Sequence, residues 1–254
     1  MPRMRMIFLS VALSLIFVSA SIAPSQTRDY GLPAGARLIE SQVIASSARP
    51  RRALLLWMSK PSQHPLPYGA EEYTCPDETR GSFYRGPTRV SLVDTGTNRL
   101  INTIKIQDES GQDSFDLPYK IRVGAHYHVP KTLAGSEGKP SIMFLKDYNG
   151  DGRALEFALF DAQACMGLQT TLVGYSIAQD MVIQFPVKLE TDEGGQRTSN
   201  TTRWIDYLFS KRPTKPGHWK YRIDYRGRGG QLEEYEIHYD PRAEMFVGKF
   251  HRHD

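Results

Sequence analysis

The chain lacks most of the features that mark a familiar enzyme or a membrane protein. Its 254 residues include only two cysteines, and after residue 20 no apolar run approaches the length of a membrane-spanning helix. The short motifs of serine hydrolases, zinc proteases, dithiol oxidoreductases and phosphate-binding loops do not occur. We therefore expect a non-catalytic protein with no membrane span after its N-terminal segment.

The net charge of the chain is also small. The formal net charge is +4, and it falls to +2 when Arg3 and Arg5 are removed with the N-terminal segment. No long run of basic residues is present in the rest of the chain. A charge this small does not support binding to nucleic acid, which requires a basic surface.

The N-terminal segment has the pattern of a secretory signal peptide. Two arginines precede an apolar run from Met6 to Val18, and Val18-Ser19-Ala20 offers small residues for cleavage. The alternative is an N-terminal membrane anchor, for which the run is short. We expect residues 1–20 to be a signal peptide, residues 21–254 to form a single β-rich domain, and the protein to be secreted or periplasmic.

An exported chain with two cysteines favours one disulfide, here between Cys75 and Cys165. The bridge would close a loop of about ninety residues and contribute on the order of 4 kcal/mol to stability. The alternative is that each cysteine is a separate small apolar residue.

The periodicity of the chain predicts an all-β fold of antiparallel sheets. Residues 88–106 read as a hairpin around Asp94-Thr95-Gly96-Thr97-Asn98, and residues 218–250 read as a meander. Further strands are expected at 37–46, 52–60, 119–129, 141–147, 155–161, 170–176, 180–187 and 204–210. A short helix is expected only at 160–166, and a surface loop at 190–202.

A weak internal repeat refines this prediction. An apolar strand, a loop with a cysteine and a Thr-led hairpin occur first around residues 53–106 and again around residues 155–187. The C-terminal meander repeats the strands without a cysteine. Repeated antiparallel units of this kind indicate a propeller-like fold or a β-sandwich.

The most specific chemical pattern is the stretch Asp147-Tyr148-Asn149-Gly150-Asp151-Gly152. Calcium takes six to eight oxygen ligands, and oxygen-bearing side chains at alternate positions of a curled loop point inward to supply them. Asp147, Asn149 and Asp151 fill the first three ligand positions, and the carbonyl of Arg153 would add another. An EF-hand is excluded because its twelfth position, normally Glu, is Ala158 and strands flank the loop.

Residues 142–161, IMFLKDYNGDGRALEFALFD, resemble the calcium loops of FG-GAP and VCBS-type β-repeat proteins. The resemblance covers about 20 residues and implies that the loop joins two strands and binds calcium through Asp147, Asn149 and Asp151. The next carboxylate of that family falls at Leu155 here, and the nearest acid is Glu156. The alternative is a metal-free turn, since Asn-Gly and Asp-Gly are both strong turn pairs.

Other residues suggest binding only weakly. Trp57, Trp204 and Trp219 would suit a sugar- or peptide-binding surface, although aromatic residues in strands more often pack in a core. Asp108, Glu109, Asp113 and Asp116 form an acidic cluster whose default interpretation is a solvated face. His126 and His128 share one strand face but have no third ligand at a recognised spacing.

The function expected from these observations is an exported, non-catalytic binding or structural protein with one structural calcium ion. A carbohydrate or protein ligand fits this expectation. The alternative is a secreted glycan-acting hydrolase with dispersed carboxylates, since the spatial separation of two acids is not visible in a sequence.

Overall fold

The computed structural model describes residues 30–44, 51–64, 81–121, 141–163, 167–193 and 196–253. The chain is all-β, and its sheets are antiparallel apart from one parallel pair of strands, which confirms the predicted fold class. Residues 1–20, Cys75, Cys165, His126 and His128 lie outside the described residues. In the described part, no helix is long and apolar enough to cross a membrane.

Within the described residues, the strands form three large sheets and a small one. The first sheet has the order β1 (Ala36–Ile44), β2 (Arg52–Ser59), β5 (Thr88–Asp94), β6 (Arg99–Ile106). The middle sheet joins β10 (Met181–Gln184), β9 (Gly167–Ser176) and β13 (Ile205–Asp206), with β8 (Glu156–Gln163) also on β9. The last sheet has the order β12 (Gln196–Thr202), β11 (Val187–Glu193), β16 (Met245–His253), β15 (Leu232–Asp240), β14 (His218–Asp224). The small sheet is β3 (Ser62–His64), β4 (Gly81–Gly86), β7 (Phe115–Ile121).

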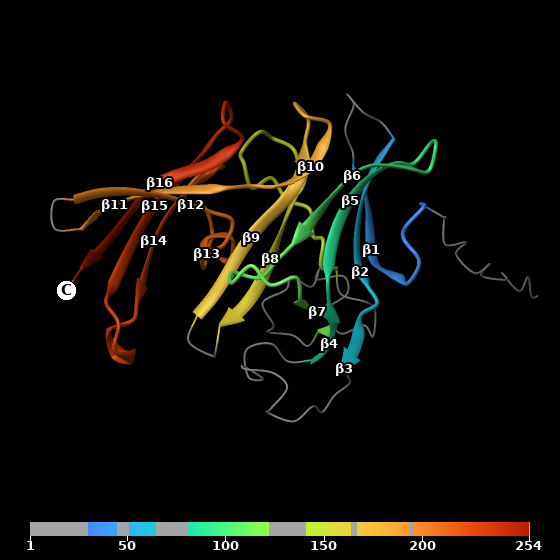
Figure 1. Ribbon diagram of the computed structural model, residues 1–254. Coiled ribbons are helices and arrows are strands. Elements are labelled where there is room, and N and C mark those ends of the chain that lie inside the picture. The colour runs from blue at the N-terminus through green and yellow to red at the C-terminus, as the bar shows by residue number, and fades with distance from the viewer. Residues whose placement is uncertain are drawn as a thin grey trace, which may run out of the picture.

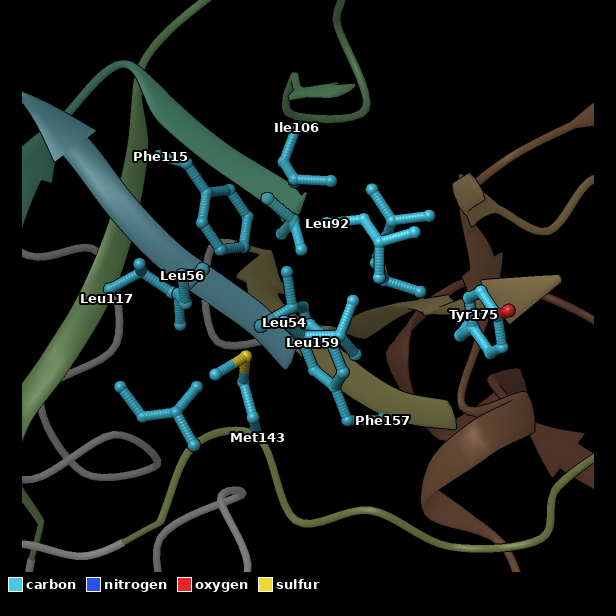
Figure 2. Packing of buried hydrophobic residues seen from close by; sticks show 14 of the residues in the cluster. Leu54, Leu56, Leu92, Ile106, Phe115, Leu117, Met143, Phe157, Leu159 and Tyr175 are labelled. Atoms are coloured by element: carbon cyan, nitrogen blue, oxygen red, sulfur yellow. The ribbon is translucent and has the colours of Figure 1, made fainter. Parts of the chain in front are cut away.

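The three large sheets lie side by side as layers, with the middle sheet between the other two (Figure 1). One core lies between the first and middle sheets, where Leu54, Leu92, Phe157 and Leu159 are fully buried (Figure 2). A second core, rich in aromatic side chains, lies between the middle and last sheets. Because β9 contributes to both cores, it is buried on both faces, as in a sandwich interior.

The internal repeat corresponds to three equivalent hairpins. Each pairs its closing residues across a four-residue turn, and in each the last turn residue has a positive φ angle. The closing pairs are Asp94 with Arg99, Ser176 with Met181 and Asp240 with Met245, and the positive-φ residues are Asn98, Asp180 and Glu244. The left-handed conformation suits Asn and Asp better than other non-glycine residues, which explains the first two choices.

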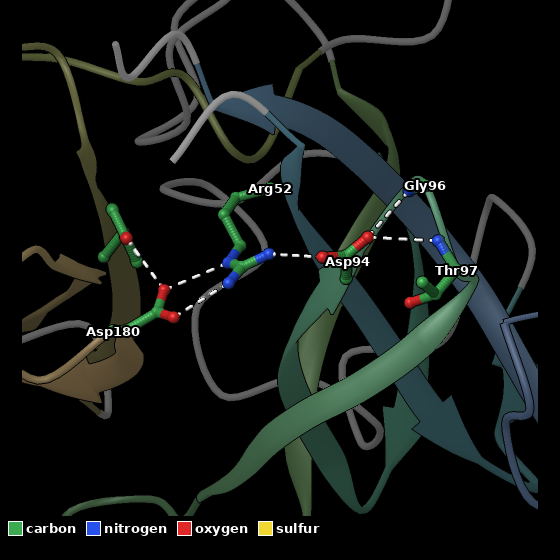
Figure 3. A network of polar contacts seen from close by, with 6 residues as sticks. Arg52, Asp94, Gly96, Thr97 and Asp180 are labelled. Atoms are coloured by element: carbon green, nitrogen blue, oxygen red, sulfur yellow. Dashed lines mark hydrogen bonds and ion pairs between the residues drawn. The ribbon is translucent and has the colours of Figure 1, made fainter. Parts of the chain in front are cut away.

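Polar contacts link the three turns. Arg52 on β2 donates to Asp94 of the first turn and, through two nitrogens, to Asp180 of the second (Figure 3). Glu244 of the third turn accepts hydrogen bonds from Ser176 (2.5 Å) and Gln179 (2.6 Å) of the second. The same end of all three hairpins is therefore connected by ionic and amide contacts.

Four predicted elements differ from the structure. The helix expected at 160–166 is wrong in its described part, because β8 continues through residues 160–163 and pairs with β9. Residues 141–147 form no strand, since Glu40 accepts the N–H groups of Ile142 and Met143 and these cannot join a sheet. The loop expected at 190–202 is instead the β11–β12 hairpin. Of the strand expected at 204–210, only β13 forms, followed by a 3-10 turn at Leu208–Ser210.

Candidate functional site

The predicted calcium loop lies directly before β8. The residues at its two ends, Lys146 and Glu156, form an isolated β-bridge. Asp147 holds the loop closed: its Oδ1 accepts the N–H groups of Gly150 (2.7 Å) and Asp151 (3.1 Å), and its Oδ2 accepts that of Gly152 (2.9 Å). Gly150 and Gly152 have φ angles of +80° and +84°, which glycine adopts without steric cost. The sharp bend expected from the two glycines is therefore present.

The other predicted ligands occupy different environments in this loop. Asn149 is half-buried and accepts the N–H of Asp151 (2.9 Å), whereas Asp151 is exposed and accepts the N–H of Arg153 (2.8 Å). The carbonyl of Arg153 accepts the N–H of Leu155 (3.2 Å). Each of these oxygens keeps a further lone pair, because a carbonyl or carboxylate oxygen can accept more than one contact.

Glu156 is the most unusual residue of the site, since its carboxylate is fully buried. Its two oxygens accept the N–H of Tyr148 (3.0 Å) and the side-chain amide of Asn149 (3.1 Å). Burial raises its pKa to about 8, and the charges of Asp151 and Asp147 add to the rise. At neutral pH the carboxyl group is therefore largely protonated, while the two N–H donors favour its ionised form.

Close packing fixes the loop against the last sheet. A side chain at Gly150 would meet the backbone of Pro216 at 2.8 Å, and one at Gly217 would meet the carbonyl oxygen of Asn149 at 2.5 Å. The ring of Tyr148 meets Phe209 edge to face at 5.9 Å. The loop thus packs against the second core through Tyr148 and against the segment before β14 through its glycine.

The structure brings Asn149 and Glu156 into contact beside Asp147, whereas Asp151 and Arg153 are exposed. Within the described residues, however, no three acidic, histidine or cysteine side chains are arranged to hold a metal ion as they stand. Calcium binding would therefore use the amide of Asn149 and backbone carbonyls as well, and would require Asp151 to turn inward. Oxygen donors of these types are the ones calcium accepts.

Neither a model of a known protein family nor a curated protein matches the chain. The likeness of the loop to FG-GAP and VCBS-type repeats consequently stays a resemblance over about 20 residues. Function is best argued from the chemistry of the sites themselves.

A second candidate site is a groove of about 720 Å³ where three sheets meet. It is lined by the end of β6 with the loop that follows, by β10, by the end of β12 with Trp204, and by Glu244. Trp204 is buried, donates its indole N–H to the carbonyl of Gln107 (2.8 Å) and packs against Phe115. The groove is within the size range of small-molecule binding sites.

Asp206 lies two residues after Trp204 and is only partly exposed. Burial raises its pKa to about 6, and the nearby charges of Glu233 and Glu109 add to the rise. Its side chain accepts a hydrogen bond from the amide of Gln169 (2.5 Å). Glu109 lines the groove, whereas Asp206 is not among its lining residues.

Neither Asp206 nor the contacts of Glu244 were predicted from the sequence. The available signal was an acid inside the apolar run Trp204-Ile205-Asp206-Tyr207-Leu208. A charged residue in such a run is costly to bury unless it is partnered or functional. Nothing local marks Glu244, because its partners are 65 and 68 residues away.

The other candidate site residues have structural roles. Asp113 and Asp116 form bidentate pairs with Arg89 and Arg85, so the acidic cluster is not one site. The three tryptophans Trp57, Trp204 and Trp219 are 5%, 8% and 1% exposed. They belong to the interior, as the alternative interpretation of the aromatic residues held, and do not form an exposed binding surface.

Proposed function

We propose that the protein is an exported, non-catalytic binding or structural protein that holds one structural calcium ion in the 147–156 loop. The N-terminal signal pattern supports export, and the packed sheets with their linked hairpin turns support a rigid scaffold. The ion would be held by Asp147, Asn149, Asp151, the carbonyl of Arg153 and Glu156. It would neutralise the loop and stabilise the native state, and it would take no part in a reaction.

The observation that carries this proposal is the buried carboxyl group of Glu156 beside Asp147 and Asp151, whose pKa of about 8 keeps it largely protonated at neutral pH. Two N–H donors favour the ionised carboxylate, while burial and two neighbouring acids oppose it. A divalent cation resolves this conflict, because it compensates all three carboxylates at once. Millimolar extracellular calcium suits weak single sites of this kind.

We expect calcium to raise the thermal midpoint of the mature protein. At about ten times Kd, linkage gives about 1.4 kcal/mol, or about 3–6 °C for a chain of this size. Calorimetric titration and thermal unfolding, each with calcium and with chelator, measure the effect. Asp151→Asn keeps an oxygen for the N–H of Arg153 and removes one charge, whereas Asp147→Asn removes one charge and also one of two acceptor oxygens. Both should abolish or strongly reduce the effect.

A matched control is Asp240→Asn, since Asp240 accepts the N–H of Arg242 in a similar turn outside the loop. This variant should keep the full response to calcium. A thermal midpoint that calcium and chelator leave unchanged in the parent protein would remove the calcium proposal. A response that Asp240→Asn loses as fully as Asp151→Asn would place the ion elsewhere.

One observation favours a second candidate, a secreted glycan-acting hydrolase. Burial raises the pKa of Asp206 to about 6, and the charges of Glu233 and of Glu109, which lines the groove, add to the rise. A carboxyl group kept protonated near a second carboxylate is the arrangement by which glycosidases protonate a leaving group. In this candidate Asp206 is the general acid and Glu109 the partner carboxylate.

For the hydrolase candidate we expect cleavage of a soluble oligosaccharide to fall as pH rises through about 6. The folded-state pKa of Asp206 lies above its ordinary value, so its proton is present below pH 6 and lost above it. Asp206→Asn should abolish cleavage, and Asp113→Asn, outside the groove, should not. Mass spectrometry of the products at pH 5 and pH 7.5 measures this. If the substrate stays intact at both pH values, the hydrolase candidate is ruled out and only the binding function remains.

A further inference from the structure

The groove is built from segments far apart in the chain. Ile104 on β6, Ile183 on β10, Thr201 on β12 and Glu244 in the β15–β16 turn all line it. Two polar contacts hold its walls in place. Asn102 exchanges two hydrogen bonds with the backbone of Val182 (2.8 and 2.9 Å), which fixes β6 against β10, and Gln179 donates to Glu244 (2.6 Å). The hollow is therefore preformed.

Its lining combines an apolar part with polar groups of several kinds. Ile104 and Ile183 are half-buried, so each presents part of its side chain to the groove. Around them stand the amide of Gln184, which donates to Thr171 (2.9 Å), and the hydroxyl groups of Thr201 and Thr202. A ligand that fits must offer apolar surface and many hydrogen-bonding groups together, because unmatched polar groups on either side weaken binding.

The charges of the lining narrow the ligand class further. The acids Asp108, Glu109 and Glu244 stand beside the cations Lys105 and Arg203. Mixed charge of this kind creates no strong field of one sign and gives no advantage to a phosphate, a nucleic acid or a polycation. Pyranose rings have apolar C–H faces and a rim of hydroxyl groups that carboxylates, amides and threonines bind.

We propose that the groove binds a short neutral oligosaccharide, with Ile104 and Ile183 under the sugar rings and Glu109 and Gln184 among the groups that bind their hydroxyls. This deepens the proposed binding function by giving it a ligand class. It does not depend on the calcium loop, since the groove and the loop share no residue.

The test uses cellotriose, maltotriose and N,N′,N″-triacetylchitotriose as probes, with the mature protein followed by calorimetry and by amide NMR shifts. At least one probe should bind, and the shifted amides should belong to the segments that line the groove. Thr201→Trp, at an exposed position on β12, should fill part of the groove and weaken binding at least about tenfold. Ser199→Trp is the matched control, since it makes the same change two residues away outside the lining.

The proposal is overturned if none of the three probes binds at a concentration of about 10 mM, which is above the millimolar Kd of a weak complex. It is also overturned if Thr201→Trp binds as well as the parent protein, or if only a mixed tripeptide pool binds. Shortened sugars in the mixture would support both the groove and the hydrolase candidate. The calcium response, measured on the same samples, reports separately on the proposed function, so a failure of one does not conceal a failure of the other.

Discussion

Replacing Phe157 with alanine is expected to lower the free energy of unfolding by about 3–5 kcal/mol. Phe157 lies on β8 and is fully buried between the first and middle sheets, in the cluster that also holds Leu54 and Leu159 (Figure 2). Removing the ring takes away its burial energy and leaves a cavity. Urea unfolding measures the loss, with an unchanged m-value as the sign that only stability has changed.

The position of β8 argues for the upper part of this range. Phe157 and Leu159 face the first core, while Ala158 between them faces the second. The strand is thus held from both sides, and its backbone cannot move to fill the cavity without disturbing the opposite core. A sheet with one solvated face would relax more and lose less.

The control is Val43→Ala on β1, because Val43 is 72% exposed. A surface truncation of this kind should change stability by no more than about 0.5 kcal/mol. Phe157→Leu should give an intermediate loss. Equal midpoints for Phe157→Ala and Val43→Ala would show that the first and middle sheets do not share the packed core described above.

The second large effect is expected for Arg52→Met, which should cost about 2–3 kcal/mol. Arg52 binds Asp180 at 2.8 and 3.0 Å and Asp94 at 2.7 Å, and its side chain is only 14% exposed (Figure 3). The hydrogen bonds with Asp180 raise the pKa of the guanidinium well above its ordinary value. Methionine keeps most of the apolar stem but leaves two partly buried carboxylates without their shared cation.

Geometry decides how other substitutions at this position behave. Arg52→Lys keeps the charge but cannot form the paired contact with Asp180 and reach Asp94 at once, so it should recover only part of the loss. Asp94 would keep its contacts with the N–H groups of Gly96 and Thr97, which are the main causes of its lowered pKa. The damage should therefore be concentrated where the β9–β10 turn meets the first sheet.

Lys220→Met is the matched control, because Lys220 and Glu236 form a pair at 3.6 Å whose side chains are 72% and 71% exposed. Exposed pairs contribute little, so this variant should stay within about 0.5 kcal/mol of the parent protein. Urea unfolding at low and high salt compares the two. If both variants lose the same small amount, the link between the hairpin turns makes no real contribution to stability.

Local sequence pattern predicted the strands that are joined by short polar turns. Residues 88–106 formed the expected hairpin, and residues 218–250 formed the expected meander, because turn residues and alternation agreed there. The helix expected at 160–166 was wrong in its described part, because residues 160–163, although good helix formers, continue β8. Pairing along the whole of β9 outweighed the weak local preference for a helix.

Residues 141–147 and 190–202 failed for a different reason. The first has the composition of a strand, but its N–H groups are taken by Glu40, about a hundred residues away. The second has the composition of a loop, yet it pairs as a polar hairpin because β16 provides a parallel neighbour for β11. Composition reflects only the local preference of a segment for strand or loop. In both cases the structure depended on partners that are distant in the chain.

At the candidate sites, too, some features follow from the local sequence and others only from the tertiary structure. The bend of the 147–152 loop follows from Asp147 and its two glycines, since all of the bonds that close it lie within six residues. The burial of Glu156, the raised pKa of Asp206 and the groove all depend on how the three sheets pack. Short-range hydrogen bonds and alternation act between neighbours and can be read along the chain. Burial and charge coupling depend on distances in space, and these exist only once the sheets have come together.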